Sequence, residues 1–201
     1  MSGPVLRPLS RKQVRRVYRW ELSAAFPPAE RRPLWSILRM MDAGVYDALG
    51  CWRGDELLGY ALLWRGADFV LLDYLGVCQG KRGQGTGAWM LEALSRRYAH
   101  TAGLLAEAEA EGPGAPPEVN ALRARRLAFY RRCGFTDVGY EADIFGVRYA
   151  VLGRREDGSL DPAAAMAAHD ALYRSRLPRR LYRRFIHIPA DGEVTERRNE
   201  T

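Results

Sequence analysis

The amino-acid sequence predicts one α/β domain with a mostly antiparallel sheet, and two observations support this fold class. The chain has 201 residues, of which 47% are hydrophobic, which is enough for one well-buried core and short for two. Residues 45–77 form short apolar runs separated by tight turns, as in an antiparallel meander, and segments with helical spacing flank them on both sides. No internal repeat or domain boundary interrupts this order.

A strand and two helices are expected before the meander. Residues 5–9 fit a short strand, and Ser10 is a suitable N-cap for a helix over residues 11–26, where apolar side chains recur at helical spacing. The prolines that follow end this helix because proline removes a backbone donor. A second, shorter helix fits residues 33–41.

The meander consists of three strands over residues 45–52, 57–64 and 69–77. Their connections, RGDE and RGAD, carry the Gly and Asp residues that tight hairpins require. Consecutive strands joined by such short turns pair antiparallel, so this segment predicts the first part of the sheet.

Helical and extended segments alternate after the meander. A glycine-rich loop is followed by a helix over residues 89–99, a strand over 104–109 and a helix over 122–133. Short strands over residues 138–145 and 147–152 complete the domain.

Residues 153–201 are expected to form a C-terminal extension that packs on the domain formed by residues 1–152. Asp161 is a suitable N-cap for a helix over residues 161–177, and a proline occupies its first position. The segment RFIHI, residues 184–188, alternates weakly between polar and apolar residues and predicts an edge strand.

The composition restricts the partners that we expect. The net charge is +7, and most of the basic residues are arginines, which are densest in residues 174–184. We interpret them as a solvated basic surface and expect no nucleic-acid partner, since nucleic-acid binding would need these side chains on one face. The alternative is a nucleic-acid-binding protein that uses these arginines.

Cysteine spacing and hydropathy predict the compartment. The three cysteines are scattered and show no metal-ligand spacing, so we expect reduced thiols and no metal. Residues 1–13 lack the apolar stretch of a signal peptide, and no segment has the run of about 18 apolar residues that spans a bilayer. We therefore expect a cytoplasmic protein without a membrane partner.

The segment CQGKRGQGTGAWML, residues 78–91, is typical of loops that hold a phosphate. It is not a nucleoside-triphosphate P-loop, because Lys81 precedes the glycine run instead of following it. The pattern GxGxxA from Gly83 to Ala88 resembles a dinucleotide motif, with Glu107 about 20 residues further on. The hairpins that precede the loop argue against that interpretation, as does the separation of Gly83 from the strand that ends at Val77.

Two motifs resemble the GNAT superfamily of N-acetyltransferases. The segment RGQGTG, residues 82–87, is similar to that family's loop for the pyrophosphate of coenzyme A, [QR]-x-x-G-x-[GA]. The segment RRLAFYRRCGF, residues 125–135, is similar to a later helix of the family, and the resemblance covers about residues 5–152. It implies a mixed, mostly antiparallel central sheet that is flanked by helices.

The resemblance also implies roles for individual residues. The backbone groups of Leu75 and Val77 contact the pantetheine arm, and the Val77 N–H polarises the thioester carbonyl. Tyr130 protonates the leaving thiolate. Arg123 stands where many relatives have Asn, and it is expected to contact the coenzyme differently. The pyrophosphate is held by the loop residues Arg82, Gly83, Gln84, Gly85, Thr86 and Gly87.

Several carboxylates are candidates for the base that deprotonates the acceptor. Glu107 and Glu109 alternate with alanine on a predicted strand and therefore share one face, which could meet a cationic substrate or be solvated. Asp73 and Glu21 are lesser candidates. None of the three histidines, at 100, 169 and 187, adjoins a nucleophile.

The resemblance implies that the chain transfers an acetyl group from acetyl-CoA, its co-substrate, directly to an amine. The acceptor is a small molecule or a peptide, and the protein is a monomer or a homodimer. A non-catalytic acyl-CoA-binding sensor with the same fold is the alternative.

Overall fold

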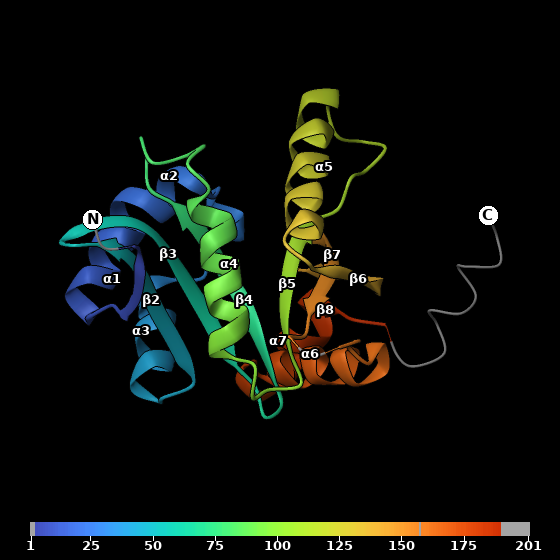
Figure 1. Ribbon diagram of the computed structural model, residues 1–201. Coiled ribbons are helices and arrows are strands. Elements are labelled where there is room, and N and C mark those ends of the chain that lie inside the picture. Colours follow the sequence, from blue (N-terminus) through green and yellow to red (C-terminus); the bar gives the residue numbers. More distant parts are fainter. Residues whose placement is uncertain (1–2, 157, 190–201) are drawn as a thin grey trace. The chain divides into compact units, whose positions relative to one another are not determined.

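The structure, a computed structural model, describes residues 3–156 and 158–189 (Figure 1). Helices and strands form two compact units, and every strand pair recorded within them is antiparallel, which confirms the predicted fold class. The units comprise residues 1–65 with 72–97, and residues 66–71 with 98–201.

The strands of the first unit follow the predicted meander. Strand β1 (Val5–Pro8) pairs antiparallel with β2 (Tyr46–Arg53), and β2 pairs antiparallel with β3 (Glu56–Arg65). Strand β4 (Phe69–Val77), which belongs to this unit from Leu72 onward, lies next to β3. The turn between β2 and β3 contains Gly54 with a φ of +59°, a conformation that glycine adopts without strain.

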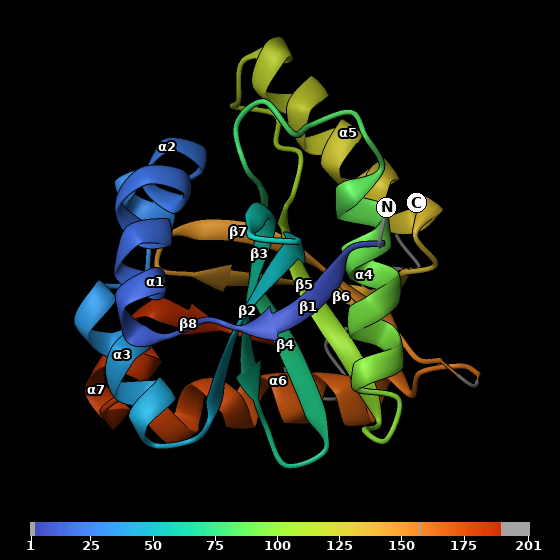
Figure 2. The ribbon, with the colours of Figure 1, turned by 60° about the vertical axis from the view of Figure 1, so that its left-hand side comes forward.

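Helices lie on both sides of these strands (Figure 2). Helix α4 (Thr86–Arg97) lies on one side, whereas the helices that precede β2 lie on the other. All five tryptophans of the chain belong to this unit. The helical elements before β2 are α1 (Arg11–Val17), η1 (Tyr18–Leu22), α2 (Ser23–Ala25), η2 (Pro28–Glu30) and α3 (Leu34–Asp42).

The helix predicted over residues 11–26 is interrupted by a π-helical turn. Ser10 caps α1 as predicted, with its side chain accepting from the Gln13 N–H. The turn η1 then inserts a wider i→i+5 bond, from the Ser23 N–H to the Tyr18 carbonyl. Val17 and Leu22, five residues apart, are both buried, and this spacing suits a π turn better than an α-helix.

The second unit has four antiparallel strands in the order β5-β7-β6-β8. Strands β6 and β7 form a hairpin that turns at Phe145 and Gly146, both with positive φ. The strands are β5 (Gly103–Glu109), β6 (Thr136–Ile144), β7 (Val147–Arg154) and β8 (Ile186–His187).

Helix α5 (Pro117–Arg132) in the second unit starts five residues before the predicted start at residue 122. Its first position is Pro117, which the first helical turn tolerates because no intrahelical bond is lost there. Helix α6 (Pro162–Arg176) is capped by Asp161 as predicted, and it packs against β5 and β6.

The last part of the predicted extension differs from expectation. Helix α7 (Arg179–Phe185) occupies most of the segment between α6 and β8, and the strand predicted over residues 184–188 shrinks to β8. Pro178 at the N-cap ends α6 and starts α7. Residues 157 and 190–201 of the predicted extension lie outside the described residues. None of the described helices combines the length and hydropathy that crossing a membrane requires.

Candidate functional site

The glycine-rich loop between β4 and α4 is exposed, and its backbone requires glycine. Gly80, Gly83 and Gly85 have φ values of +74°, +78° and +75°, in the left-handed region that other residues avoid. A Cβ atom added at any of the three would meet no atom within 4 Å. Backbone conformation therefore selects glycine here, and open space remains beside the loop.

The start of α4 supplies backbone donors to this loop. The Trp89 N–H donates to the Gly85 carbonyl at 3.0 Å, which is the first α-helical bond. The N–H groups of Thr86, Gly87 and Ala88 therefore have no acceptor within the helix. Together with the positive end of the helix dipole, these groups favour an anion at this position.

The two basic side chains of the loop differ in their availability. Lys81 forms an ion pair with Glu56 of β3. Arg82 is exposed and forms no ion pair with any residue that the structure describes, and Gln84 is also exposed. The predicted pyrophosphate loop thus presents one free cation next to a set of free backbone donors.

The last residues of β4, from Leu75 to Val77, are partly exposed, whereas the strand before them is mostly buried. A Cβ atom at Gly76 would lie 2.3 Å from the Tyr60 Cζ and 2.5 Å from its Oη, so the Tyr60 ring lies directly over this glycine. Within the described chain, the buried Tyr60 hydroxyl has no hydrogen-bond partner. No sequence motif marks Tyr60, and the glycine inside the strand indicates only that another group approaches closely there.

A carboxylate, a phenol and a thiol meet at this end of β4, and we call Glu21, Tyr60 and Cys78 the Glu21 cluster. The Glu21 carboxylate accepts from the Gln79 N–H at 3.3 Å. Burial first, and then the charge of Glu21, raise the pKa of Cys78 to about 11. Burial also raises the pKa of Tyr60, with further contributions from Cys78 and Glu21, whereas the charge of Arg82 opposes this shift. The thiol and the phenol are therefore neutral at pH 7.

Asp73, a lesser base candidate, is held in a buried ion pair. Its Oδ2 accepts from the Arg32 Nε at 2.9 Å and from the Tyr46 hydroxyl at 2.5 Å. Burial and the Asp73 charge raise the pKa of Tyr46, so its hydroxyl remains a donor. These contacts connect β2 and β4 with the segment before α3.

Tyr130 is placed on α5 in the second unit. Its side chain is buried against Phe135, with ring centroids 5.4 Å apart in an edge-to-face arrangement. Burial raises the pKa of Tyr130 to about 12, although the charge of Arg126 opposes this shift. Its hydroxyl makes no hydrogen bond to another described residue, so a neutral phenol is available as a proton donor.

Glu109 and Arg123, predicted as a base and as a coenzyme contact, form an ion pair with each other. The Arg123 Nε lies 3.0 Å from Glu109 Oε2, and the Arg126 Nη1 lies 3.5 Å from Oε1. The Glu109 side chain is 11% exposed. Any role in proton transfer would have to coexist with these two arginines.

Glu107 is the centre of a buried network that the sequence did not predict. It accepts from His169 Nε2 at 2.7 Å and from the Tyr173 hydroxyl at 2.8 Å, both from α6. A carboxylate only accepts, so His169 Nε2 donates to it, and the other ring nitrogen, Nδ1, forms a hydrogen bond with the Tyr140 hydroxyl at 2.8 Å. His169 is fully buried, so these bonds tie α6 to β5 and β6.

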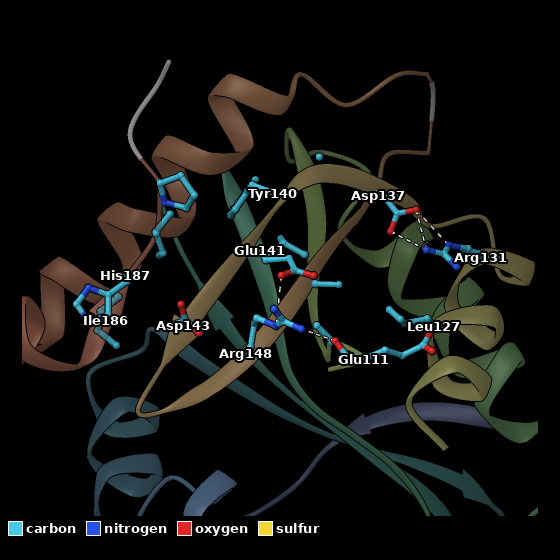
Figure 3. Close-up of a pocket in the computed structure, with 16 residues that line it drawn as sticks. Glu111, Leu127, Arg131, Asp137, Tyr140, Glu141, Asp143, Arg148, Ile186 and His187 are labelled. Atoms are coloured by element: carbon cyan, nitrogen blue, oxygen red, sulfur yellow. Dashed lines mark hydrogen bonds and ion pairs between the residues drawn. The ribbon is translucent and has the colours of Figure 1, made fainter. Parts of the chain in front are cut away.

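A cavity of about 730 Å³ lies in the second unit (Figure 3). Figure 3 shows Arg131 facing Asp137 and Arg148 facing Glu141, and both are ion pairs. None of the predicted site residues lines this cavity. Among the described residues, no group of His, Cys, Asp or Glu side chains is arranged to hold a metal ion.

The predicted site residues are therefore distributed over both units. Leu75, Val77 and the loop from Arg82 to Gly87 are contiguous in the first unit. Glu107, Glu109, Arg123 and Tyr130 belong to the second unit, where the ion pair brings two of them together.

Comparison with known proteins finds a similarity to one family. Residues 46–137 match the family model described as "Acetyltransferase (GNAT) domain". No curated protein matches the chain. The matched residues contain the meander, the glycine-rich loop and Tyr130.

Solved structures show the same fold at low sequence identity. A GNAT-family acetyltransferase of Bacteroides thetaiotaomicron has a TM-score of 0.63 and 20% identity, covering 84% of this chain and 96% of its own. The ribosomal-protein-S18-alanine N-acetyltransferase of Escherichia coli has a TM-score of 0.57 and 16% identity, covering 78% and 99%. AAC(6')-Ib, in complex with parmomycin and acetyl-CoA, has a TM-score of 0.56 and 16% identity, covering 77% and 94%.

Proposed function

Residues 46–137 match the model of the GNAT acetyltransferase domain, and from this match we propose that the protein belongs to that family and transfers an acetyl group from acetyl-CoA directly to an amine. The observation that carries the proposal is the exposed loop between β4 and α4. It combines left-handed glycines, N–H groups at Thr86 and Gly87 that have no acceptor within the helix, and Arg82, which forms no ion pair with a described residue. These groups suit a pyrophosphate, and the similar AAC(6')-Ib has been solved with acetyl-CoA bound.

The pantetheine arm would follow the last residues of β4. Strand backbone at Leu75 and Val77 offers N–H and carbonyl groups to the amides of the arm. We assign the Val77 N–H to the thioester carbonyl, where a fixed donor stabilises the charge that develops in the tetrahedral intermediate. The partial exposure of this end of β4 supports the assignment.

The leaving thiolate requires a proton, and we assign its transfer to Tyr130. Its raised pKa keeps the phenol protonated at neutral pH, and its hydroxyl is not used by another described residue. Arg123, which pairs with Glu109, could reach a phosphate only by giving up part of that ion pair. We therefore propose a lesser role in coenzyme binding for Arg123 than for Arg82.

The acceptor is an amine on a small molecule or a peptide. The similar structures include an alanine N-acetyltransferase of a ribosomal protein and an aminoglycoside complex, so the fold alone does not select one acceptor. Cys51, Cys78 and Cys133 are all free thiols, which supports a reducing compartment, the cytoplasm.

The test is ligand-dependent stability followed by turnover. Acetyl-CoA at 100 times its dissociation constant should add about 2.7 kcal/mol to the free energy of unfolding, whereas NAD and ATP should add little. Acetyl transfer to a panel of primary amines should then fall about 10²-fold or more in Tyr130→Phe. Tyr182→Phe is the matched control, since that hydroxyl donates to Asp170 instead.

Three outcomes are decisive. Stabilisation by NAD alone would contradict the proposal. Binding of acetyl-CoA without transfer to any amine would support the non-catalytic sensor. Equal rates in Tyr130→Phe and Tyr182→Phe would remove the assignment of the general acid.

A further inference from the structure

The Tyr60 hydroxyl is a buried polar group that the proposed coenzyme contacts do not use. The residue is 1% exposed, and within the described chain its oxygen finds no hydrogen-bond partner. Buried hydroxyls in folded proteins are nearly always paired, so an unpaired one beside a candidate site requires an explanation, and a ligand is one. Its partner should be found near Gly76, over which the ring lies.

Two charged groups act on this hydroxyl, Glu21 and Arg82 of the glycine-rich loop, and Glu21 is the hydrogen-bond acceptor of the two. Its carboxylate accepts from the Gln79 N–H at 3.3 Å, immediately after β4, and it pairs with no cation in the described part of the chain. The charge of Glu21 acts on both Tyr60 and Cys78, which places the three groups in one environment.

The backbone that carries Glu21 is unusual. Glu21 belongs to the π-helical turn η1, and such turns inside α-helices occur frequently at functional sites. The turn keeps Leu22 buried and leaves Glu21 only partly buried, so the carboxylate remains accessible. This observation is independent of the unpaired hydroxyl, and both concern the same end of β4.

The chemistry of the two groups selects the ligand. A carboxylate only accepts hydrogen bonds, and a phenol oxygen can accept one. A thioester carbonyl has no hydrogen to donate, so it would add no hydrogen bond at Glu21 to the one from the Gln79 N–H. A primary ammonium has three donors and a positive charge, and it can donate to Glu21 and to Tyr60 at the same time.

We propose that Glu21 and Tyr60 form the acceptor subsite, in which Glu21 binds the ammonium and removes its proton while the Tyr60 oxygen positions the nitrogen. This inference rests on the proposed acetyl transfer and names a base for it. Both residues belong to the first unit: Tyr60 lies on β3, next to β4, and Glu21 accepts from the N–H of Gln79, two residues after Val77.

The step balances without a further reagent. One N–H proton of the ammonium passes to the Glu21 carboxylate, and the freed lone pair forms the C–N bond to the thioester carbon. Collapse of the intermediate breaks the C–S bond, and the thiolate leaves with a proton from the general acid. The second nitrogen proton leaves through solvent and restores the general acid, which gives a neutral amide, and Glu21 returns its proton to water.

Binding is tested on the dead-end complex with coenzyme A, which cannot react. The probes are n-butylamine, ethanolamine, spermidine and Nα-acetyl-lysine, each against sodium chloride of equal ionic strength. At least one amine should raise the melting temperature of the wild-type complex, and Glu21→Gln and Tyr60→Phe should abolish this shift. Glu92→Gln, an exposed carboxylate on α4, should retain it.

The kinetic test uses acetyl-CoA and the amine that binds best. Glu21→Gln should lower kcat/KM about 10²-fold or more, as expected for loss of a general base. Tyr60→Phe should raise the amine KM about tenfold with little change in the KM for acetyl-CoA, because one hydrogen bond to a charged group is lost. Tyr74→Phe, which loses hydrogen bonds to Glu30 and Arg32, should leave the amine KM unchanged.

The outcomes separate this inference from the proposed function. Failure of acetyl-CoA to bind would contradict the proposed function. Normal acetyl-CoA binding with unchanged amine kinetics in both variants would overturn only this inference, as would the absence of any amine-induced shift in the wild-type complex. Tyr60→Phe should be at least as stable as the wild type without ligand, since it removes an unpaired hydroxyl, and a clear loss of stability would indicate a structural role instead.

Discussion

Arg123 and Glu109 form an ion pair in which the Arg123 Nε lies 3.0 Å from a Glu109 carboxylate oxygen. The resemblance to known acetyltransferases implied a coenzyme contact for the first residue, and the strand pattern made the second a candidate base. Because the two side chains pair with each other, variants of both residues can test whether they act in catalysis or only in stability.

A double-mutant cycle measures this ion pair. Glu109→Gln and Arg123→Gln should show an interaction energy of about 1 kcal/mol in urea unfolding, because both side chains are largely shielded from water. If the pair is mainly structural, kcat should change less in Glu109→Gln than in Glu21→Gln. A larger decrease of kcat in Glu109→Gln than in Glu21→Gln would instead support Glu109 as the base.

The left-handed glycines of the loop give a second prediction. Gly83→Ala and Gly85→Ala should each lower the free energy of unfolding by about 1–2 kcal/mol and weaken acetyl-CoA binding, because alanine is strained at positive φ. Gly114→Ala is the control, since that glycine has open space and lacks a left-handed φ. Equal stability of Gly85→Ala and Gly114→Ala would show that the loop adopts another conformation in solution.

Alkaline pH should reduce stability through Tyr130. Burial raises its pKa to about 12, above the value near 10 of an exposed phenol, so the folded state retains a proton that the unfolded state loses. This pKa difference contributes about 2–3 kcal/mol to the free energy of unfolding. The contribution is fully present below pH 10 and is lost as the pH rises to 12. Urea unfolding at pH 9 and 11 should show a smaller decrease for Tyr130→Phe than for the wild type. An identical decrease would mean that Tyr130 is not buried in solution.

The buried network around His169 should be necessary for stability. His169→Ala removes a hydrogen-bond partner from both Glu107 and Tyr140. It should therefore lower the free energy of unfolding by about 3 kcal/mol or more. His187→Ala, at an exposed position, should change the free energy of unfolding by less than about 0.5 kcal/mol. Similar values for the two variants would show that the network contributes little.

Local patterns predicted most elements of the fold. The N-cap at Ser10, the hairpin glycines and the N-cap at Asp161 each act within a few residues, and the structure confirms all three. Helix α7 was missed because RRLYRRF is mostly arginine and shows little apolar periodicity. The π turn was missed because a five-residue apolar spacing resembles an imperfect α-helix.

Parts of the candidate site whose residues are adjacent in the sequence could be predicted from a motif. The loop from Arg82 to Gly87 is one motif, and its glycine conformations agree with the proposed role. Contacts between distant residues left no local pattern: His169 and Glu107 are 62 residues apart, and Gln79 and Glu21 are 58 apart. Tyr60 could be found only from the space above Gly76.

The distribution of tryptophan gives the protein an intrinsic optical reporter. All five indoles belong to the first unit and none to the second, so fluorescence emission during denaturation follows the first unit alone. Far-ultraviolet circular dichroism records the helices and strands of both units. Coincidence of the two denaturation curves would mean that both units unfold in one cooperative transition, and separate midpoints would give each unit its own stability.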